Sequence, residues 1–200
     1  MYNWRNMSQA QREEALEIRK RHGQPWHGPP HGIEKGWHHI AAACYEHLSL
    51  IGTSPNRMAI FEKALLATLG SACESVGAWC VLPNHYHALV QCMSLQECRK
   101  ALGRLHGRTS FEWNADDSAR GRKCWHRVLP KPIKSERHRW ATINYIHHNP
   151  VHHGYAKTWS AWPFSSARQY LESVGRERAE EIWKSYPVLD LGREWDPPEL

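Results

Sequence analysis

Apolar residues recur along the chain in runs that predict alternating strands and helices. The residues from Trp37 to Glu46 are mostly small, apolar or aromatic, which indicates a first buried strand. The apolar positions from Asn56 to Val76 follow helical spacing and predict a helix. Two apolar runs, Ala78 to Leu82 and His85 to Cys92, are typical of one strand that is interrupted or bulged at Pro83.

The second half of the chain continues this alternation. Ser94 is suited to cap a helix from Leu95 to about Trp113, and the residues from Cys124 to Leu129 predict a short strand. A further helix is expected from Ser135 to about His148, closed by Pro150, because the residue before a proline disfavours the helical conformation. Shorter helices are predicted from near Ser8, a suitable N-cap, to Arg21, and from Ser165 to Ser173.

The order of these elements indicates an α+β domain. The central strands are too apolar to face water on both sides, so we expect an antiparallel sheet with helices packed on it. Around it we distinguish an N-terminal helix with a Pro/His-rich arm over residues 1–36, the central domain over 37–171, and an acidic tail over 172–200.

Charge is distributed unevenly along the chain. The net charge is +6, yet residues 99–139 alone contain twelve Lys and Arg against four Asp and Glu. Residues 172–200 contain eight acidic and four basic side chains. A basic centre suggests a polyanionic partner such as nucleic acid, with an ordinary solvated surface as the alternative. The acidic tail is then a candidate to fold over the basic region and compete with DNA.

The cysteines and the apolar runs bear on where the protein acts. The six cysteines show no CxxC spacing and fall mostly in apolar segments, which favours reduced core thiols over disulfides or a zinc site. No apolar run is long enough to cross a membrane, and the N-terminus has no apolar core of a signal peptide. We therefore expect a cytoplasmic protein, associated with the nucleoid if its partner is DNA.

The first candidate for chemistry is a pair of histidines within an apolar strand. On a strand, residues two apart project from the same face, so His85 and His87 point together while Tyr86 points the opposite way. Two neutral imidazoles on one side form half of a metal site. Taken alone, the pair is better explained by partly buried histidines bonded to the backbone.

The second candidate is a tyrosine followed four residues later by an asparagine. If Tyr145 lies on the late helix, Asn149 shares its face, which places a phenol nucleophile beside an oxygen ligand. The alternative is a packing tyrosine and an asparagine that ends the helix before Pro150.

Taken together, the two patterns resemble the arrangement of the HUH single-strand nucleases. More closely, the chain resembles the REP-associated tyrosine transposases, relatives of the insertion-sequence single-strand transposases. The resemblance runs from about Trp37 to Leu171 and is carried by ordered motifs: VLPNHYHALV at 81–90, YIHHNPV at 145–151, His153-Gly154, and WPFSS at 162–166.

This resemblance implies a ferredoxin-like sheet with the histidine motif on a central strand. It implies His85, His87 and Asn149 as ligands of Mg²⁺ or Mn²⁺, and Tyr145 as the nucleophile that forms a 5′-phosphotyrosine. The implied substrate is hairpin single-stranded DNA, a REP-like palindrome flanked by a tetranucleotide. Tyr86 departs from the family pattern, in which an aliphatic residue holds that place.

Several expectations about partners remain open at this point. A lone nucleophile is compatible with a homodimer, and no membrane partner is expected. Rival functions are a non-catalytic nucleic-acid-binding module on the same fold and a metallonuclease that uses water; a replication initiator or relaxase is more remote. Candidate DNA contacts come from the basic region: Arg104, Arg108, Arg122, Lys123, Trp125, Arg127, Lys131 and Lys134. The remaining histidines, His147, His148, His152 and His153, match no zinc spacing and are assigned structural or phosphate-contact roles.

Overall fold

The computed structural model describes residues 8–21 and 35–188. The chain divides into two units, Met1–Gly32 and Ile33–Leu200, and each is described by itself. Within the first unit, the described residues form one helix, α1 (Gln9–Arg21). The Pro/His-rich arm at 22–34 and the end of the acidic tail at 189–200 lie outside the described residues. In the described part of the chain, every helix is too short or too polar to cross a bilayer.

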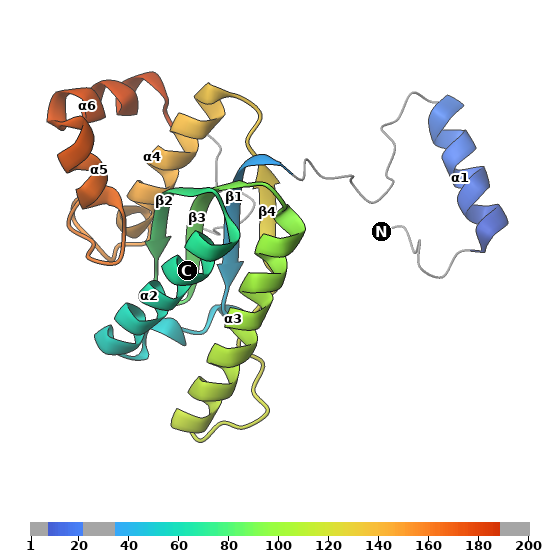
Figure 1. The fold of residues 1–200 in the computed structure, drawn as a ribbon, viewed down its shortest axis with the longest axis horizontal. Coiled ribbons are helices and arrows are strands. Elements are labelled where there is room, and N and C mark those ends of the chain that lie inside the picture. The colour runs from blue at the N-terminus through green and yellow to red at the C-terminus, as the bar shows by residue number, and fades with distance from the viewer. Residues whose placement is uncertain (1–7, 22–34, 189–200) are drawn as a thin grey trace. The chain divides into compact units, whose positions relative to one another are not determined.

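Four antiparallel strands form the centre of the second unit (Figure 1). They are β1 (Gly36–Ala43), β2 (Ser75–Val81), β3 (His85–Cys92) and β4 (Leu129–Pro132). The order across the sheet is β2-β3-β1-β4, so the two strands at the centre are β3 and β1. With α2 (Pro55–Ala72) between β1 and β2 and α3 (Leu95–Asp116) between β3 and β4, this is the ferredoxin-like arrangement predicted above.

Up to residue 188, three further helices follow β4: α4 (Glu136–His152), α5 (Ala167–Val174) and α6 (Arg176–Ser185). The Ser94 cap behaves as the sequence predicts, and Ser135 forms a second cap. The side chain of Ser94 accepts a hydrogen bond from the Glu97 amide at the start of α3. Ser135 does the same for the His138 amide at the start of α4. Each cap satisfies an amide that the first turn of a helix leaves without a partner.

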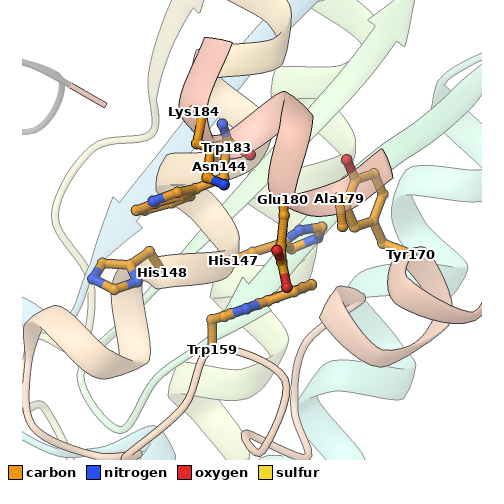
Figure 2. Close-up of a pocket in the computed structure, with 9 residues that line it drawn as sticks. All are labelled: Asn144, His147, His148, Trp159, Tyr170, Ala179, Glu180, Trp183 and Lys184. Atoms are coloured by element: carbon orange, nitrogen blue, oxygen red, sulfur yellow. The ribbon is translucent and has the colours of Figure 1, made fainter. Parts of the chain in front are cut away.

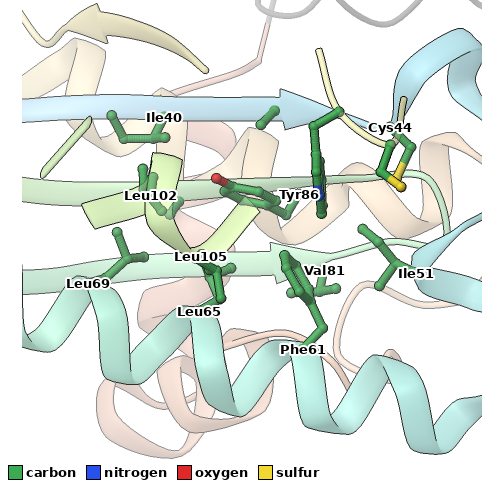
Figure 3. Close-up of a cluster of buried hydrophobic side chains, with 14 of the residues drawn as sticks. Ile40, Cys44, Ile51, Phe61, Leu65, Leu69, Val81, Tyr86, Leu102 and Leu105 are labelled. Carbon is green, nitrogen blue, oxygen red and sulfur yellow. The ribbon is translucent and has the colours of Figure 1, made fainter. Parts of the chain in front are cut away.

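Helices cover both faces of the sheet, and each face has its own apolar core. On one face, α2 and α3 pack Phe61, Leu65, Leu102 and Leu105 against the strands (Figure 3). On the other face, α4 packs Ile143, Tyr145 and Ile146 against Ala78, Cys80, Leu82 and Leu89. Since successive residues of a strand alternate between faces, β3 contributes alternate side chains to the two cores.

Two of the differences between predicted and observed elements involve prolines. The run around Pro83 is not one bulged strand, because β2 and β3 are two strands paired antiparallel across the Pro83 turn. The strand predicted at 124–129 is wrong: Trp125 makes an isolated bridge to Cys44, and β4 begins only at Leu129. The late helix does not close at Pro150 and continues to His152.

Candidate active site

His85 and His87 lie at the start of β3 and face α4. Strand alternation sends both imidazoles to this side of the sheet, where they are 6% and 1% exposed. Their ring centroids are 5.0 Å apart. Tyr86 projects to the opposite face, where it is fully buried against Phe61 and its hydroxyl lies 3.1 Å from Nε2 of His106. The expected separation of Tyr86 from the histidine pair is therefore confirmed.

Helix α4 brings Tyr145 and Asn149 to the same place. The two residues are one helical turn apart, so both face the sheet. The phenol oxygen of Tyr145 lies 3.5 Å from Nε2 of His87. The amide oxygen of Asn149 lies 3.0 Å from Nε2 of His85. The structure thus gathers all four predicted site residues into one buried cluster between β3 and α4.

Asn84 determines which nitrogen of His85 carries the proton. The side-chain nitrogen of Asn84 donates a hydrogen bond to the carbonyl of His47 at 3.2 Å, which turns its oxygen toward His85. That oxygen lies 2.7 Å from Nδ1 of His85 and can only accept. In the neutral ring Nδ1 is therefore the donor, and Nε2 carries a lone pair directed toward Asn149.

The pairing of His85 with Asn149 therefore brings two acceptors together. A lone pair on Nε2 and the amide oxygen of Asn149 lie 3.0 Å apart, an arrangement that a shared cation would stabilise. Two ligands at about 2.1 Å from one octahedral ion are about 3.0 Å from each other. The donor set of imidazole nitrogen and amide oxygen also suits a divalent ion such as Mn²⁺ or Mg²⁺. These residues fit the expected metal.

The electrostatics of the site keep its imidazoles neutral. Burial, followed by the neighbouring His153 whose ring lies 5.0 Å away, lowers the pKa of His85 to about 3. Burial, followed by His85 itself, holds the pKa of His87 well below its usual value. A neutral imidazole is the form that binds a metal ion, so both rings are in the binding form near neutral pH.

His39 is a site residue that the sequence analysis did not single out. It lies on β1, on the α4 face, with Nε2 3.1 Å from Nδ1 of His87. Its ring also meets that of Tyr145 edge to face at 5.7 Å. Burial, followed by the charges of Lys131 and His138, lowers the pKa of His39 to about 3. Its ring is therefore neutral and can accept a hydrogen bond from His87. In the sequence His39 is only a histidine within a buried strand. Its place beside His87 follows from the β1–β3 pairing, which the sequence alone does not give.

The candidate DNA contacts fall into different environments. Arg104 and Arg108 on α3, together with Lys123, Arg127 and Lys134, are exposed. Lys131 pairs with His39 across β1 and β4 and therefore lies on the same face as the histidine pair. Arg122 is engaged by Asp117 at 2.7 Å and by Asn114 at 3.0 Å.

Trp125 does not belong among the DNA contacts, contrary to the prediction. It is 8% exposed, and one face of its ring stacks on His106 at 4.2 Å. Phe61 stacks on the ring at 5.4 Å, and the indole nitrogen donates to Thr109 at 3.1 Å. A base has no access to this ring, so Trp125 is a core residue of the α2–α3 face.

The other histidines in the last turns of α4 and just after it lie in two places. His153 joins the site through its ring contact with His85. His147 is buried on another side of the helix, with Nε2 2.8 Å from the hydroxyl of Ser166. His147 and His148 line a cavity of about 330 Å³ between α4 and the following helices (Figure 2). The aromatic rings of Trp159, Tyr170 and Trp183 also line it, and none of the four predicted site residues does.

Comparison with known proteins agrees with the motifs. No family model matches the chain. A protein of Haemophilus influenzae, provisionally named a REP-associated tyrosine transposase, is 26% identical over 129 residues, covering 57% of this chain and 69% of that protein. The solved structure of a REP-associated tyrosine transposase bound to a REP hairpin aligns with a TM-score of 0.56 at 19% identity, covering 74% of this chain and 86% of the other, which shows a common fold. The predicted resemblance is confirmed: in sequence and in fold, this chain resembles the REP-associated tyrosine transposases.

Proposed function

We propose that this chain is a transposase of the REP-associated type, which cuts and rejoins single-stranded DNA beside a hairpin. The observation that carries the proposal is the convergence of four side chains. The phenol of Tyr145 lies 3.5 Å from His87, and His85 faces Asn149 across 3.0 Å. A nucleophile beside a metal-binding cluster is the arrangement that phosphodiester transfer requires.

The reaction consists of two transfers at phosphorus. In the first, the Tyr145 oxygen forms a bond to phosphorus while the bond to the 3′ oxygen breaks, and the phenol proton ends on that 3′ oxygen. In the second, a DNA 3′-hydroxyl attacks the 5′-phosphotyrosine, the bond to Tyr145 breaks, and the proton returns to the phenol. A phenol has a pKa of about 10, so it leaves more readily than an alkoxide and the first step can be reversed.

The metal site determines how the phosphate is activated. His85, His87 and Asn149 would hold Mn²⁺ or Mg²⁺, which when bound neutralises a non-bridging phosphate oxygen and stabilises charge developing in the transition state. The chain's own contribution is orientation: Asn84 and His39 lie against the Nδ1 atoms of the two histidines and direct both Nε2 atoms toward α4. Burial of the cluster excludes the bulk water that would otherwise hydrolyse the phosphotyrosine.

DNA would approach over the β1–β4 side of the sheet. Lys131 lies on the face of the site, and the adjacent groove of about 560 Å³ is lined by Trp37, Lys134 and Arg139 among others. A ring beside cationic side chains is suited to single-stranded DNA, because bases stack on the ring while cations follow the phosphates. The solved relative holds a REP hairpin, which supports a hairpin partner here.

The test is formation of a covalent complex. The protein is incubated with Mn²⁺ and end-labelled hairpin DNA carrying a single-stranded 5′ flank, and the products are separated on a denaturing gel. We expect a protein–DNA adduct that disappears in Tyr145→Phe and His87→Ala and persists in Tyr86→Phe, the matched control on the opposite face of β3. Phosphotyrosine in the digested adduct identifies the bond.

Other outcomes distinguish the rival functions. Hairpin binding that is equal in the unmodified protein and Tyr145→Phe, without any adduct, would indicate a binding module. Free 5′-phosphate ends that survive in Tyr145→Phe would indicate a metallonuclease that uses water.

A further inference from the structure

Three of the six cysteines meet at one place in the structure, far from one another in sequence. Cys73 caps the end of α2, Cys92 is the last residue of β3, and Cys98 lies in the first turn of α3. Their sulfur atoms all lie within 4.8 Å of one another, and those of Cys73 and Cys92 are 3.6 Å apart. Because the residues come from three elements, only the fold brings these thiols together.

This thiol cluster is separate from the candidate active site. Cys92 lies six positions beyond Tyr86 on β3 and shares its face, so the cluster lies on the α2–α3 side of the sheet. His85 and His87 lie on the other face, at the opposite end of the strand. The proposed DNA reaction therefore leaves these cysteines without a role.

The spacing of the sulfur atoms is that of ligands around one metal ion. Thiolate sulfur binds Zn²⁺ at about 2.3 Å, so two such ligands lie about 3.8 Å apart in tetrahedral and about 4.0 Å apart in trigonal geometry. The observed separations, from 3.6 Å to at most 4.8 Å, reach these values with side-chain shifts below about 1 Å. An ordinary apolar core has no requirement for three sulfurs at this spacing.

The thiol cluster is reached by an entering ion from one side. Cys92 and Cys98 are fully buried, whereas Cys73 is only partly buried and gives access from solvent. Hydrogen bonding with Cys73, followed by Cys92 and by burial, raises the pKa of the Cys98 thiol, so an ion that binds there must displace a proton. Within the described residues, the group of candidate ligands contains these three thiols and no carboxylate or imidazole.

We propose that Cys73, Cys92 and Cys98 bind one thiophilic d¹⁰ cation, Zn²⁺ or Cu⁺. Soft thiolate ligands select such ions over Mg²⁺ and Mn²⁺, so the two sites of the protein take different metals. Cu⁺ is satisfied by three sulfurs, and Zn²⁺ would add a water at the exposed side of Cys73. Each thiol that binds releases its proton to solvent, and no redox change is involved. The bound ion joins the end of α2, the end of β3 and the start of α3, and so stabilises the α2–α3 face.

The proposal is tested by titrating the reduced, metal-free full-length protein with Co²⁺ as a spectroscopic substitute for Zn²⁺, and separately with Cu⁺. The absorption band from sulfur-to-metal charge transfer appears only when thiolates bind the metal, so a metal ion at the histidine site does not contribute to it. We expect a band that saturates at one ion per chain and persists in His85→Ala. Competition with chelators of known affinity for Zn²⁺ and for Cu⁺ then identifies the preferred ion.

Two cluster variants and one control decide the assignment. Cys73→Ser, at a partly exposed position, and Cys98→Ala should each weaken metal binding by at least about 100-fold. That is the largest loss expected when only a residue that supports a ligand is removed, so a greater loss indicates a direct ligand. Cys124→Ser should bind normally, because its thiol lies outside the cluster and donates to Asn114, as a hydroxyl also can. In the unmodified protein, bound Zn²⁺ should protect Cys73 from alkylation.

Three results would overturn the proposal: absence of a sulfur band with both metals, a band that survives in Cys73→Ser and Cys98→Ala, or alkylation of Cys73 at an unchanged rate with saturating Zn²⁺. None of them bears on the DNA reaction, which is measured separately with Mn²⁺.

Discussion

At the scale of single residues, the candidate site depends on which nitrogen of each imidazole carries the proton. Asn84 accepts from Nδ1 of His85, and His39 lies 3.1 Å from Nδ1 of His87. An acceptor on Nδ1 leaves the lone pair on Nε2, which is the atom that faces α4 in both histidines. We therefore expect His39 to act as a positioning residue through His87.

Replacing His39 should weaken metal binding while preserving the fold. His39→Phe keeps a ring in the buried position but cannot accept from His87, so we expect the Mn²⁺ concentration for half-maximal adduct formation to rise by about 10- to 100-fold. His39→Gln restores an acceptor and should recover part of the loss. Equal Mn²⁺ dependence in all three proteins, with equal melting temperatures, would show that His39 only fills space.

His106 should make the α2–α3 face sensitive to acid. Its ring stacks on Trp125 at 4.2 Å, and burial lowers its pKa to about 4, against about 6.5 when unfolded. Between these values the unfolded chain binds a proton that the folded chain does not. The free energy of unfolding is therefore highest above about pH 6.5 and falls as the pH falls toward 4.

Urea unfolding of the native protein and His106→Gln measures this contribution. Between about pH 7.5 and pH 4.5, the native protein should lose on the order of 2 to 3 kcal/mol more than the variant, which keeps an acceptor for Tyr86 but does not titrate. Parallel losses in the two proteins would assign the acid sensitivity to other buried groups.

The sequence predicted site residues that are close together in the chain and share a strand or helix face. It missed the residue whose contact depends on how two strands pair. His85 and His87, two apart on a strand, and Tyr145 and Asn149, four apart on a helix, follow from local periodicity. His39 could not be predicted, because its contact with His87 depends on the β1–β3 register. Trp125 was misplaced because its position in a basic segment says nothing about the direction of its side chain.

At the scale of elements, the turn between β2 and β3 determines where the histidine pair begins. Pro83 and Asn84 separate the strands, and the amide of Gly52 donates to the Pro83 carbonyl at 2.9 Å. A methyl group on Gly52 would lie 2.7 Å from the α-carbon of Pro83, too close for either backbone to remain in place. The sequence showed the proline but not the loop that packs against it, so a single strand, interrupted or bulged at Pro83, was predicted where a hairpin turn occurs.

Gly52→Ala should therefore disturb both stability and the site. We expect a loss of about 1 to 3 kcal/mol in the free energy of unfolding, as for other overpacked positions, together with reduced adduct formation. Gly70→Ala is the matched control, because nothing lies within 4 Å of its added carbon and alanine favours the helix α2. Similar denaturation midpoints for the two variants would contradict the close approach at Pro83.

At the scale of the whole second unit, the two faces of the sheet have different tasks. The face under α2 and α3 is apolar around Tyr86 and holds the thiol cluster at one end. The face under α4 carries the histidine pair, Tyr145 and Asn149. Figure 1 shows this division of helices around the four strands. The overall architecture followed from the alternation of apolar segments, whereas the pairing of elements across each face required the structure.

Both outer strands of the sheet are partly blocked against a further strand. On β4, Pro130 pairs with Ile40 and Pro132 pairs with His38. Because proline has no backbone N–H, the outer edge of β4 lacks amide donors at these two positions. On β2, the amide of Val81 donates to the carbonyl of Phe164, and Ser166 donates to the carbonyl of Trp79. Two copies of this protein, brought together to exchange the ends of a DNA strand, would consequently not extend the sheet through these blocked positions, and contacts between helices or through the DNA are the expected alternative.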